Sequence, residues 1–305
     1  MIKKTLVVFM MKHNPKITAL LLVMFLVTQF IGLYVVNHYQ AEEEDLPYGL
    51  ETPDPETQSD FYKILSQILI AFIIAVTLLF LLTQFKVEII LRIWFFLVIL
   101  IALAISFNSF FPEFRYVSLI ALLVALPLTI AKIFGRDIII HNFTELLIYP
   151  GIAAIFVPIL NVVTIIIFLL LISVYDAWAV WHSGIMQKMA KYQIDKLKIF
   201  SGFFVPYVSK KVRMKLKKMK KSELRKKKVR VNVAILGGGD VIFPIITAGV
   251  MLKTLGLIPA IFVIIGATLG LSYLMLFAEK KKFYPAMPYI SAGIFAGIAL
   301  SYLVF

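Results

Sequence analysis

The chain has 305 residues, of which 61% are hydrophobic and only 16% are charged, and its mean hydropathy is +0.93. Soluble domains are about half apolar and a quarter charged, so this composition excludes a soluble protein and predicts an all-α polytopic membrane protein. The lack of cysteine excludes disulfides, iron–sulfur clusters and thiolate zinc sites. Because the four histidines are scattered and form no HExxH pair, we expect no metal site and no cofactor.

Apolar runs between charged residues predict nine membrane-spanning helices, each close to the roughly 20 residues that a span requires. The first run follows four lysines, but it is full length and lacks a small-residue cleavage site, so it is interpreted as a span and not a signal peptide. The stretch 143–181 is too long for one helix, so Pro158 to Asn161 is interpreted as a tight turn. The predicted spans cover residues 17–36, 64–85, 89–107, 117–134, 143–158, 161–181, 231–252, 257–277 and 285–304.

The distribution of basic residues predicts how these spans are oriented. With the N-terminus in the cytoplasm, 28 of the 31 Lys and Arg residues fall on the inner side and 3 on the outer side. Cytoplasmic loops carry an excess of Lys and Arg, and the outer loop 37–62 carries eight acidic residues and no basic one. We therefore expect a cytoplasmic N-terminus and a C-terminus outside.

One long connection, residues 182–230, divides the chain into a six-span part (1–181) and a three-span part (231–305). Its 17 basic residues resemble a nucleic-acid patch, but a cytoplasmic loop that sets orientation and contacts anionic lipid is the favoured interpretation. Within it, residues 185–199 look amphipathic and are expected on the membrane surface. The apolar residues 199–207 are too short to span and are interpreted as a membrane-surface anchor.

Two acidic residues lie well inside predicted spans, Asp176 in the sixth and Asp240 in the seventh. Ionisable groups inside a membrane are costly and indicate function, whereas Glu88 and Glu145 fall at span ends and are interpreted as interfacial. At 1.5 Å per residue the two aspartates lie roughly 8 Å and 14 Å from the cytoplasmic ends of antiparallel neighbours. Their carboxylates are therefore expected at similar depth.

Two further segments are expected on the same side of the membrane. Gly237-Gly238-Gly239 directly precedes Asp240 and would let an extended peptide approach the backbone, although a packing face for a neighbouring helix is the alternative. Pro285-Ala286-Met287 begins the ninth span, where prolines are ordinary. The segment therefore indicates function only because it is expected on the same side of the membrane as the two aspartates.

The three motifs together resemble those of a known family. Tyr175-Asp176, Gly237-x-Gly239-Asp240 and Pro285-Ala286-Met287 are similar to the YD, GxGD and PAL motifs of the presenilin and signal peptide peptidase family. The resemblance covers the whole chain in motif order, span number and the long loop after the sixth span, and departs at Met287, where the family has Leu. It implies a presenilin-like intramembrane aspartyl protease with Asp176 and Asp240 catalytic and with Tyr175 and the other two segments shaping the site.

The resemblance also implies a reaction and its partners. The expected reaction is hydrolysis of peptide bonds within or near membrane-spanning helices, with one carboxylate activating water and one protonated carboxyl group acting as acid. Single-span or signal-peptide-like proteins are the expected substrates and the lipid bilayer the surroundings, with no nucleic acid; an assembly of identical copies is compatible with the sequence. The orientation is similar to that of presenilins, and residues 199–207 could alternatively be compared with the segment in which presenilins are cut.

Lysine outnumbers arginine by 25 to 6, a balance that hints at a warm-growing prokaryote. Together with the resemblance, which is to archaeal-type presenilin homologues, this balance gives a prokaryotic, archaeal plasma membrane as the expected location.

The alternative function is a proton- or cation-coupled transporter, since transporters also use paired intramembrane acids and broken helices. The six-plus-three layout has no obvious inverted repeat, which argues against a transporter. A membrane metalloprotease would need HExxH, and His182-Ser183-Gly184 does not match the nucleophile motif of a membrane serine protease.

Overall fold

In the computed structural model the described residues are 15–41, 46–85, 88–135, 137–183, 201–207, 232–278 and 284–304. Nine helices in these ranges are long and apolar enough to cross a membrane, as predicted. They are α1 (Pro15–Ala41), α2 (Gln58–Gln84), α3 (Glu88–Asn108), α4 (Val117–Phe134), α5 (Ile138–Phe156), α6 (Val162–Trp178), α10 (Gly238–Leu255), α11 (Leu257–Phe277) and α12 (Met287–Val304).

The turn predicted between the fifth and sixth spans is present. Helix α5 ends at Phe156, and Asn161 caps α6 by accepting a hydrogen bond from the Thr164 N–H at 2.9 Å. The Thr164 hydroxyl in turn accepts from the Asn161 N–H at 3.0 Å, so the two residues form a reciprocal cap. This polar pair explains why one long apolar run folds as a hairpin.

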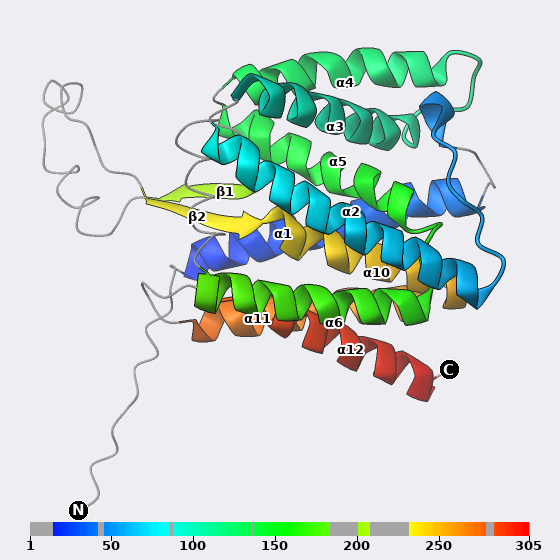
Figure 1. The fold of residues 1–305 in the computed structure, drawn as a ribbon, viewed down its shortest axis with the longest axis vertical. Coiled ribbons are helices and arrows are strands. Elements are labelled where there is room, and N and C mark those ends of the chain that lie inside the picture. Colours follow the sequence, from blue (N-terminus) through cyan, green and yellow to red (C-terminus); the bar gives the residue numbers. More distant parts are fainter. Residues whose placement is uncertain are drawn as a thin grey trace, which may run out of the picture.

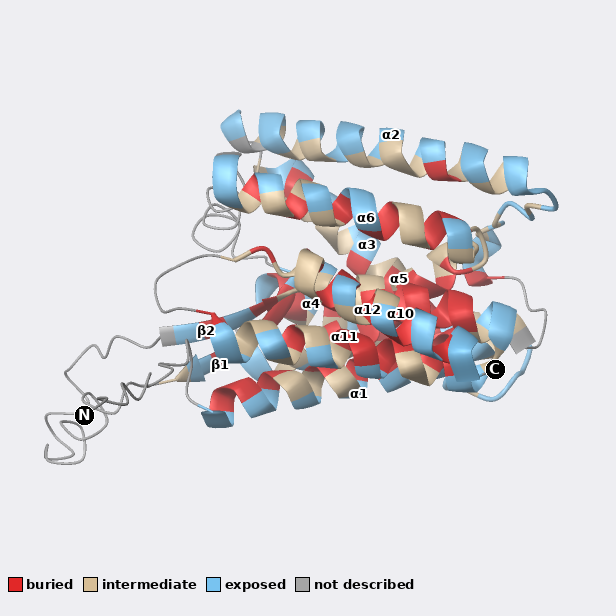
Figure 2. Cartoon of the chain, turned by 90° about the horizontal axis from the view of Figure 1, so that it is seen from below, coloured by how far each residue is buried: buried red, intermediate tan, exposed pale blue. Residues whose placement is uncertain are grey.

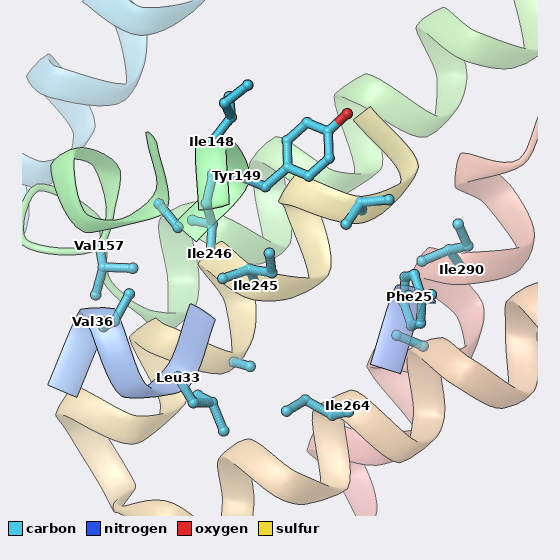
Figure 3. Packing of buried hydrophobic residues seen from close by; sticks show 14 of the residues in the cluster. Phe25, Leu33, Val36, Ile148, Tyr149, Val157, Ile245, Ile246, Ile264 and Ile290 are labelled. Atoms are coloured by element: carbon cyan, nitrogen blue, oxygen red, sulfur yellow. The ribbon is translucent and has the colours of Figure 1, made fainter. Parts of the chain in front are cut away.

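Helix α10 lies at the centre of the bundle and contacts α1, α5, α6, α11 and α12. Figure 1 shows α3, α4 and α5 on one side of it and α11 and α12 on the other. Apolar side chains from these helices form one continuous core, in which Phe25, Tyr149, Ile245, Ile264 and Ile290 are buried (Figure 3). The core therefore surrounds the helix that carries the GxGD motif.

Helix α2 lies at the edge of the bundle and is exposed along most of its length (Figure 2). In the most apolar 18-residue stretch of α2 only 6% of the residues are buried, against 56% in α10. The side chains that it exposes are apolar and include Ile70, Ile73 and Ile74. Large exposed apolar surfaces mark contact with a membrane or a partner. Because α2 is also long and apolar enough to cross a membrane, we interpret its exposed side as a surface in contact with lipid.

A short β-hairpin precedes α10, and the sequence analysis did not predict it. Strands β1 (Gly202–Tyr207) and β2 (Asn232–Gly237) pair antiparallel, with Gly202 opposite Gly237. The prediction of one helix over 231–252 is thus wrong before Gly238, because β2 alternates the exposed Val233 and Ile235 with buried neighbours. The hairpin places the glycines at a strand-to-helix junction.

The surface-anchor interpretation of 199–207 is wrong for residues 202–207. Phe203 is fully buried and packs edge-to-face on Tyr149 with ring centroids 5.9 Å apart, so the segment is part of the protein core. The predictions for 185–199 and for the basic residues up to 230 lie outside the described residues.

The interfacial interpretation of Glu145 is also wrong. Asp137 caps α5 by accepting from the Ile139 N–H at 2.7 Å, so α5 begins at Ile138, five residues before the predicted start. Glu145 therefore lies inside the helix, where it is 1% exposed and pairs with Lys132 of α4 at 2.6 Å. Glu88 begins α3 and stays partly exposed beside Arg92.

Candidate active site

Asp176 lies near the end of α6, just before a turn of π-helix, η2 (Ala179–Ser183). Its side chain is buried, and its Oδ2 accepts a hydrogen bond from the Met287 N–H at 3.0 Å. Met287 is the first residue of α12, and the first N–H groups of a helix have no partner within it. Asp176 therefore caps α12, and this contact joins the YD and PAL-like motifs.

Asp240 lies in the first turn of α10, directly after the hairpin. Gly237 ends β2 in an extended conformation, with φ −65° and ψ 147°, and its backbone is hydrogen-bonded to the Asp240 carboxyl group. The structure places the carboxyl groups of Asp176, from α6, and Asp240, from α10, within electrostatic range of each other.

The three glycines before Asp240 differ in their surroundings. A side chain on Gly238 would place Cβ 2.8 Å from the Tyr149 hydroxyl oxygen, so Tyr149 and the nearby Ser201 leave no space there. A Cβ on Gly239 would meet nothing closer than the Phe243 ring at 3.8 Å. The close packing considered for the glycine run therefore applies to Gly238 and not to Gly239.

Tyr175 points toward the edge of the bundle. Its ring packs edge-to-face on Phe72 of α2, with centroids 5.3 Å apart, and lies near Trp178 at 6.4 Å. Successive residues of a helix point about 100° apart, which separates the direction of Tyr175 from that of Asp176. Tyr175 therefore ties the helix that carries Asp176 to the loosely packed α2.

A cavity of about 120 Å³ lies beside Asp240, with room for about four water molecules. Its walls come from α1, β2, α11 and the segment before α12. Pro285 is buried beside it, and α12 starts at Met287, two residues after the predicted start. The lining residues are Leu21, Ile235, Leu236, Asp240, Leu271, Leu274, Met275, Ala278, Tyr284 and Ala286.

Two polar residues at this site were not identified from the sequence. Gln29 of α1 is fully buried, and its Nε2 donates to the Val241 carbonyl oxygen at 3.0 Å, in the first turn of α10. The fully buried Tyr149 of α5 places its hydroxyl 3.3 Å from the Ser201 hydroxyl. The sequence signal for both residues is a polar group inside an apolar run.

No group of three or more His, Asp or Glu side chains in the described part of the chain comes together in a way that could hold a metal ion. The site consists of two carboxyl groups, backbone amides and a small cavity. Such an arrangement can activate water between two carboxyl groups.

Comparisons with known proteins identify a family and a similar fold. A family model described as "Signal-peptide peptidase, presenilin aspartyl protease" matches residues 22–305. The chain is also similar to two solved structures titled as a presenilin family intramembrane aspartate protease. The structure in space group C222 shares 18% sequence identity with this chain and has a TM-score of 0.61; the alignment covers 94% of this chain and 99% of that chain. The structure in space group P2 is 18% identical with a TM-score of 0.60, covering 93% and 97%. A comparison with curated proteins finds no match.

Proposed function

Because the chain belongs to the signal-peptide peptidase and presenilin family of aspartyl proteases, we propose that Asp176 and Asp240 form its catalytic pair. The chain is a multi-pass membrane protein and an intramembrane aspartic endopeptidase by its family and its nine apolar helices. The observation that carries the assignment of the pair is that the two carboxyl groups, which come from α6 and α10 beside the start of α12, lie within electrostatic range of each other.

The proposed reaction uses the two carboxyl groups in different protonation states. Two carboxyl groups that share a site cannot both ionise cheaply, so the pair holds one proton. The carboxylate takes a proton from a water molecule, whose oxygen attacks the scissile carbonyl carbon, while the carboxylic acid protonates the carbonyl oxygen. Collapse of the tetrahedral intermediate then breaks the C–N bond: the carboxyl group that took the proton from water gives it to the leaving amine nitrogen, and the other carboxylate takes back its proton from the hydroxyl group as the new carbonyl forms. The two groups titrate as one coupled pair.

Strand β2 provides a backbone edge on which an unwound substrate could bind. The outer edge of β1 is already occupied, because the Asn142 side chain donates to the Phe204 carbonyl at 2.8 Å and accepts its N–H at 2.9 Å. Phe204 pairs with Ile235. Since the polar groups of Phe204 point away from the hairpin, those of Ile235 point away on the opposite edge.

In the described part of the chain no further strand pairs with this edge of β2, and the edge leads to Asp240, because Ile235 and Leu236 line the same cavity as Asp240. We propose that a substrate helix unwinds locally and adds as a strand to β2, which exposes its peptide bonds next to Asp240. The substrates would be single-span or signal-peptide-like membrane proteins, cleaved within or near the membrane.

The proposed orientation has the N-terminus in the cytoplasm and the C-terminus outside, in a prokaryotic, archaeal plasma membrane. Reporter fusions should place residues 37–62 and Phe305 outside and residues 182–230 inside. A cytoplasmic C-terminus would contradict the count of basic residues on which this orientation rests.

The function is tested by incubating the purified protein in detergent with a single-span substrate and identifying the products by mass spectrometry. Cleavage without any ion gradient is expected, and the D176N/D240N double variant, purified in the same way, controls for contaminating proteases. Absence of cleavage, together with gradient-driven uptake into vesicles, would favour the transporter instead.

A further inference from the structure

A row of polar side chains follows the face of α5 that points toward the hairpin. His141, Glu145 and Tyr149 are spaced four residues apart and so lie on one face of the helix. The His141 Nε2 is 2.8 Å from the Gly202 carbonyl oxygen. Glu145 accepts from the Lys132 ammonium group, and both side chains of this ion pair are at most 3% exposed. The row thus connects α4 and α5 to the start of β1.

Stability alone does not account for the buried ion pair of this row. Replacing a buried ion pair by apolar residues of similar volume is often neutral or stabilising, and charges inside a membrane protein are costly. A pair placed in the core at this cost suggests that its position serves the site.

Tyr149 connects the ion pair to the junction that carries Asp240. Its ring extends from α5 toward the beginning of α10, with the hydroxyl at the tip (Figure 3). The hydroxyl lies 3.3 Å from the Ser201 hydroxyl, and the Ser201 carbonyl accepts the Gly238 N–H at 3.2 Å. Tyr149 also interacts electrostatically with Glu145 on one side and with Asp240 on the other.

We propose that Tyr149 is a positioning residue for Asp240. Its hydroxyl, supported by the Lys132–Glu145 ion pair, holds Ser201 and Gly238 in place and so directs the Asp240 carboxyl group toward Asp176. This role rests on the proposed catalytic pair. Helix α5, which carries none of the three motifs, would thereby contribute to the reaction.

The variant that tests this role is Tyr149→Phe, which keeps the buried ring and removes the hydroxyl. The matched control is Tyr39→Phe, because Tyr39 is 4% exposed and donates to the Ile105 carbonyl at 2.8 Å in a separate apolar cluster. Tyr149→Phe should lower kcat about 10- to 100-fold, since small misplacements of a reacting group have effects of this size. KM should stay within about twofold, because the hydroxyl is directed at the junction and not at a bound peptide.

The pH profile of kcat separates positioning from simple packing. Among the described residues, Asp176 from α6 and Tyr149 from α5 interact electrostatically with Asp240, and Tyr284 from the segment before α12 lines the same cavity. Loss of the Tyr149 hydroxyl should therefore shift the profile, whereas Tyr39→Phe should change only thermal stability. If the wild-type enzyme cleaves but Tyr149→Phe and Tyr39→Phe have the same kcat and pH profile, the positioning role of Tyr149 is overturned while the catalytic pair stands. A wild-type chain that cleaves nothing would refute the catalytic pair, and the positioning role with it.

A second variant tests the support behind Tyr149. The double substitution Lys132→Met and Glu145→Leu keeps the volume of the ion pair and should fold, because such replacements are tolerated in protein cores. We expect a smaller loss of kcat, about 3- to 10-fold, with a pH profile shifted in the same direction as in Tyr149→Phe. An unchanged kcat and profile in a folded double variant would overturn the supporting role of the pair.

Discussion

The two aspartates reach the same site from different local structures. Asp176 belongs to a continuous helix, and its carboxyl group is hydrogen-bonded to the backbone of Ala286 and Met287 at the start of α12. Asp240 follows a strand and a tight junction, which Tyr149, Ser201 and Gln29 hold from three other parts of the chain. The first carboxyl group is therefore placed by its helix and by contacts with one neighbouring helix start, whereas the second depends on contacts from three other parts of the chain. Substitutions around Asp240 should therefore affect activity more than those around Asp176.

The largest expected effect is the same for both aspartates. Asp176→Asn and Asp240→Asn should each abolish cleavage, because either change removes half of the acid–base pair, and the double variant should be no slower than the single ones. The measurement is product formation from a single-span substrate, with circular dichroism to show that the variants are folded. Retention of a tenth of the wild-type rate by either variant would contradict a shared pair.

Next in size is a matched pair of glycine substitutions on the Asp240 side. Gly238→Ala should slow cleavage more than about 10-fold, because its Cβ would lie 2.8 Å from the Tyr149 hydroxyl oxygen and force the junction to move. Gly239→Ala should stay near the wild-type rate, since its nearest neighbour is 3.8 Å away and alanine favours the helix by about 1 kcal/mol. Equal rates in these two variants would mean that the junction is not held as described.

On the Asp176 side a backbone substitution should have a smaller effect. Met287→Pro removes the N–H group that donates a hydrogen bond to Asp176, and proline is tolerated at the first position of a helix. We expect a several-fold lower kcat than in Met287→Ala, which loses the same buried side chain but keeps the donor. Met287→Leu should be nearly neutral, because volume and polarity hardly change. A Met287→Pro rate equal to that of Met287→Ala would show that the hydrogen bond has no part in placing Asp176.

Pro285→Ala should have the smallest effect that is still measurable. Without the proline, α12 can extend by up to one turn toward Lys282 and hide backbone groups that a substrate would use. Cleavage should fall while the pH profile keeps its shape, because the two aspartates still set it. Full activity would leave this segment as a mere helix start, and a shifted profile would mean that it contacts the carboxyl groups directly.

Local patterns in the sequence were sufficient for the nine helices and the two aspartates. Long apolar runs determine membrane spans directly, and a capping pair such as Asn161 and Thr164 is visible within four residues. The β-hairpin was missed because β2 pairs with a strand about 30 residues earlier, and nothing in either segment alone indicates its partner.

The buried pair of Lys132 and Glu145 was missed for a related reason. Both residues lie near predicted span ends, where charges are ordinary, and their pairing depends on how α4 and α5 are rotated against each other. Tyr149 is likewise an unremarkable aromatic residue in an apolar run, and its role depends on the hairpin that the sequence analysis did not predict.

The central claim, that Asp176 and Asp240 act as one pair on an attacking water, is tested most directly by binding two peptide mimics. One mimic carries a hydroxyl group at the scissile position and the other carries hydrogen there. The wild-type protein should bind the hydroxyl mimic at least about 100-fold more tightly, as expected for a transition-state analogue, and both single Asn variants should lose this preference. A wild-type protein without the preference, or an Asn variant that keeps it, would contradict the claim.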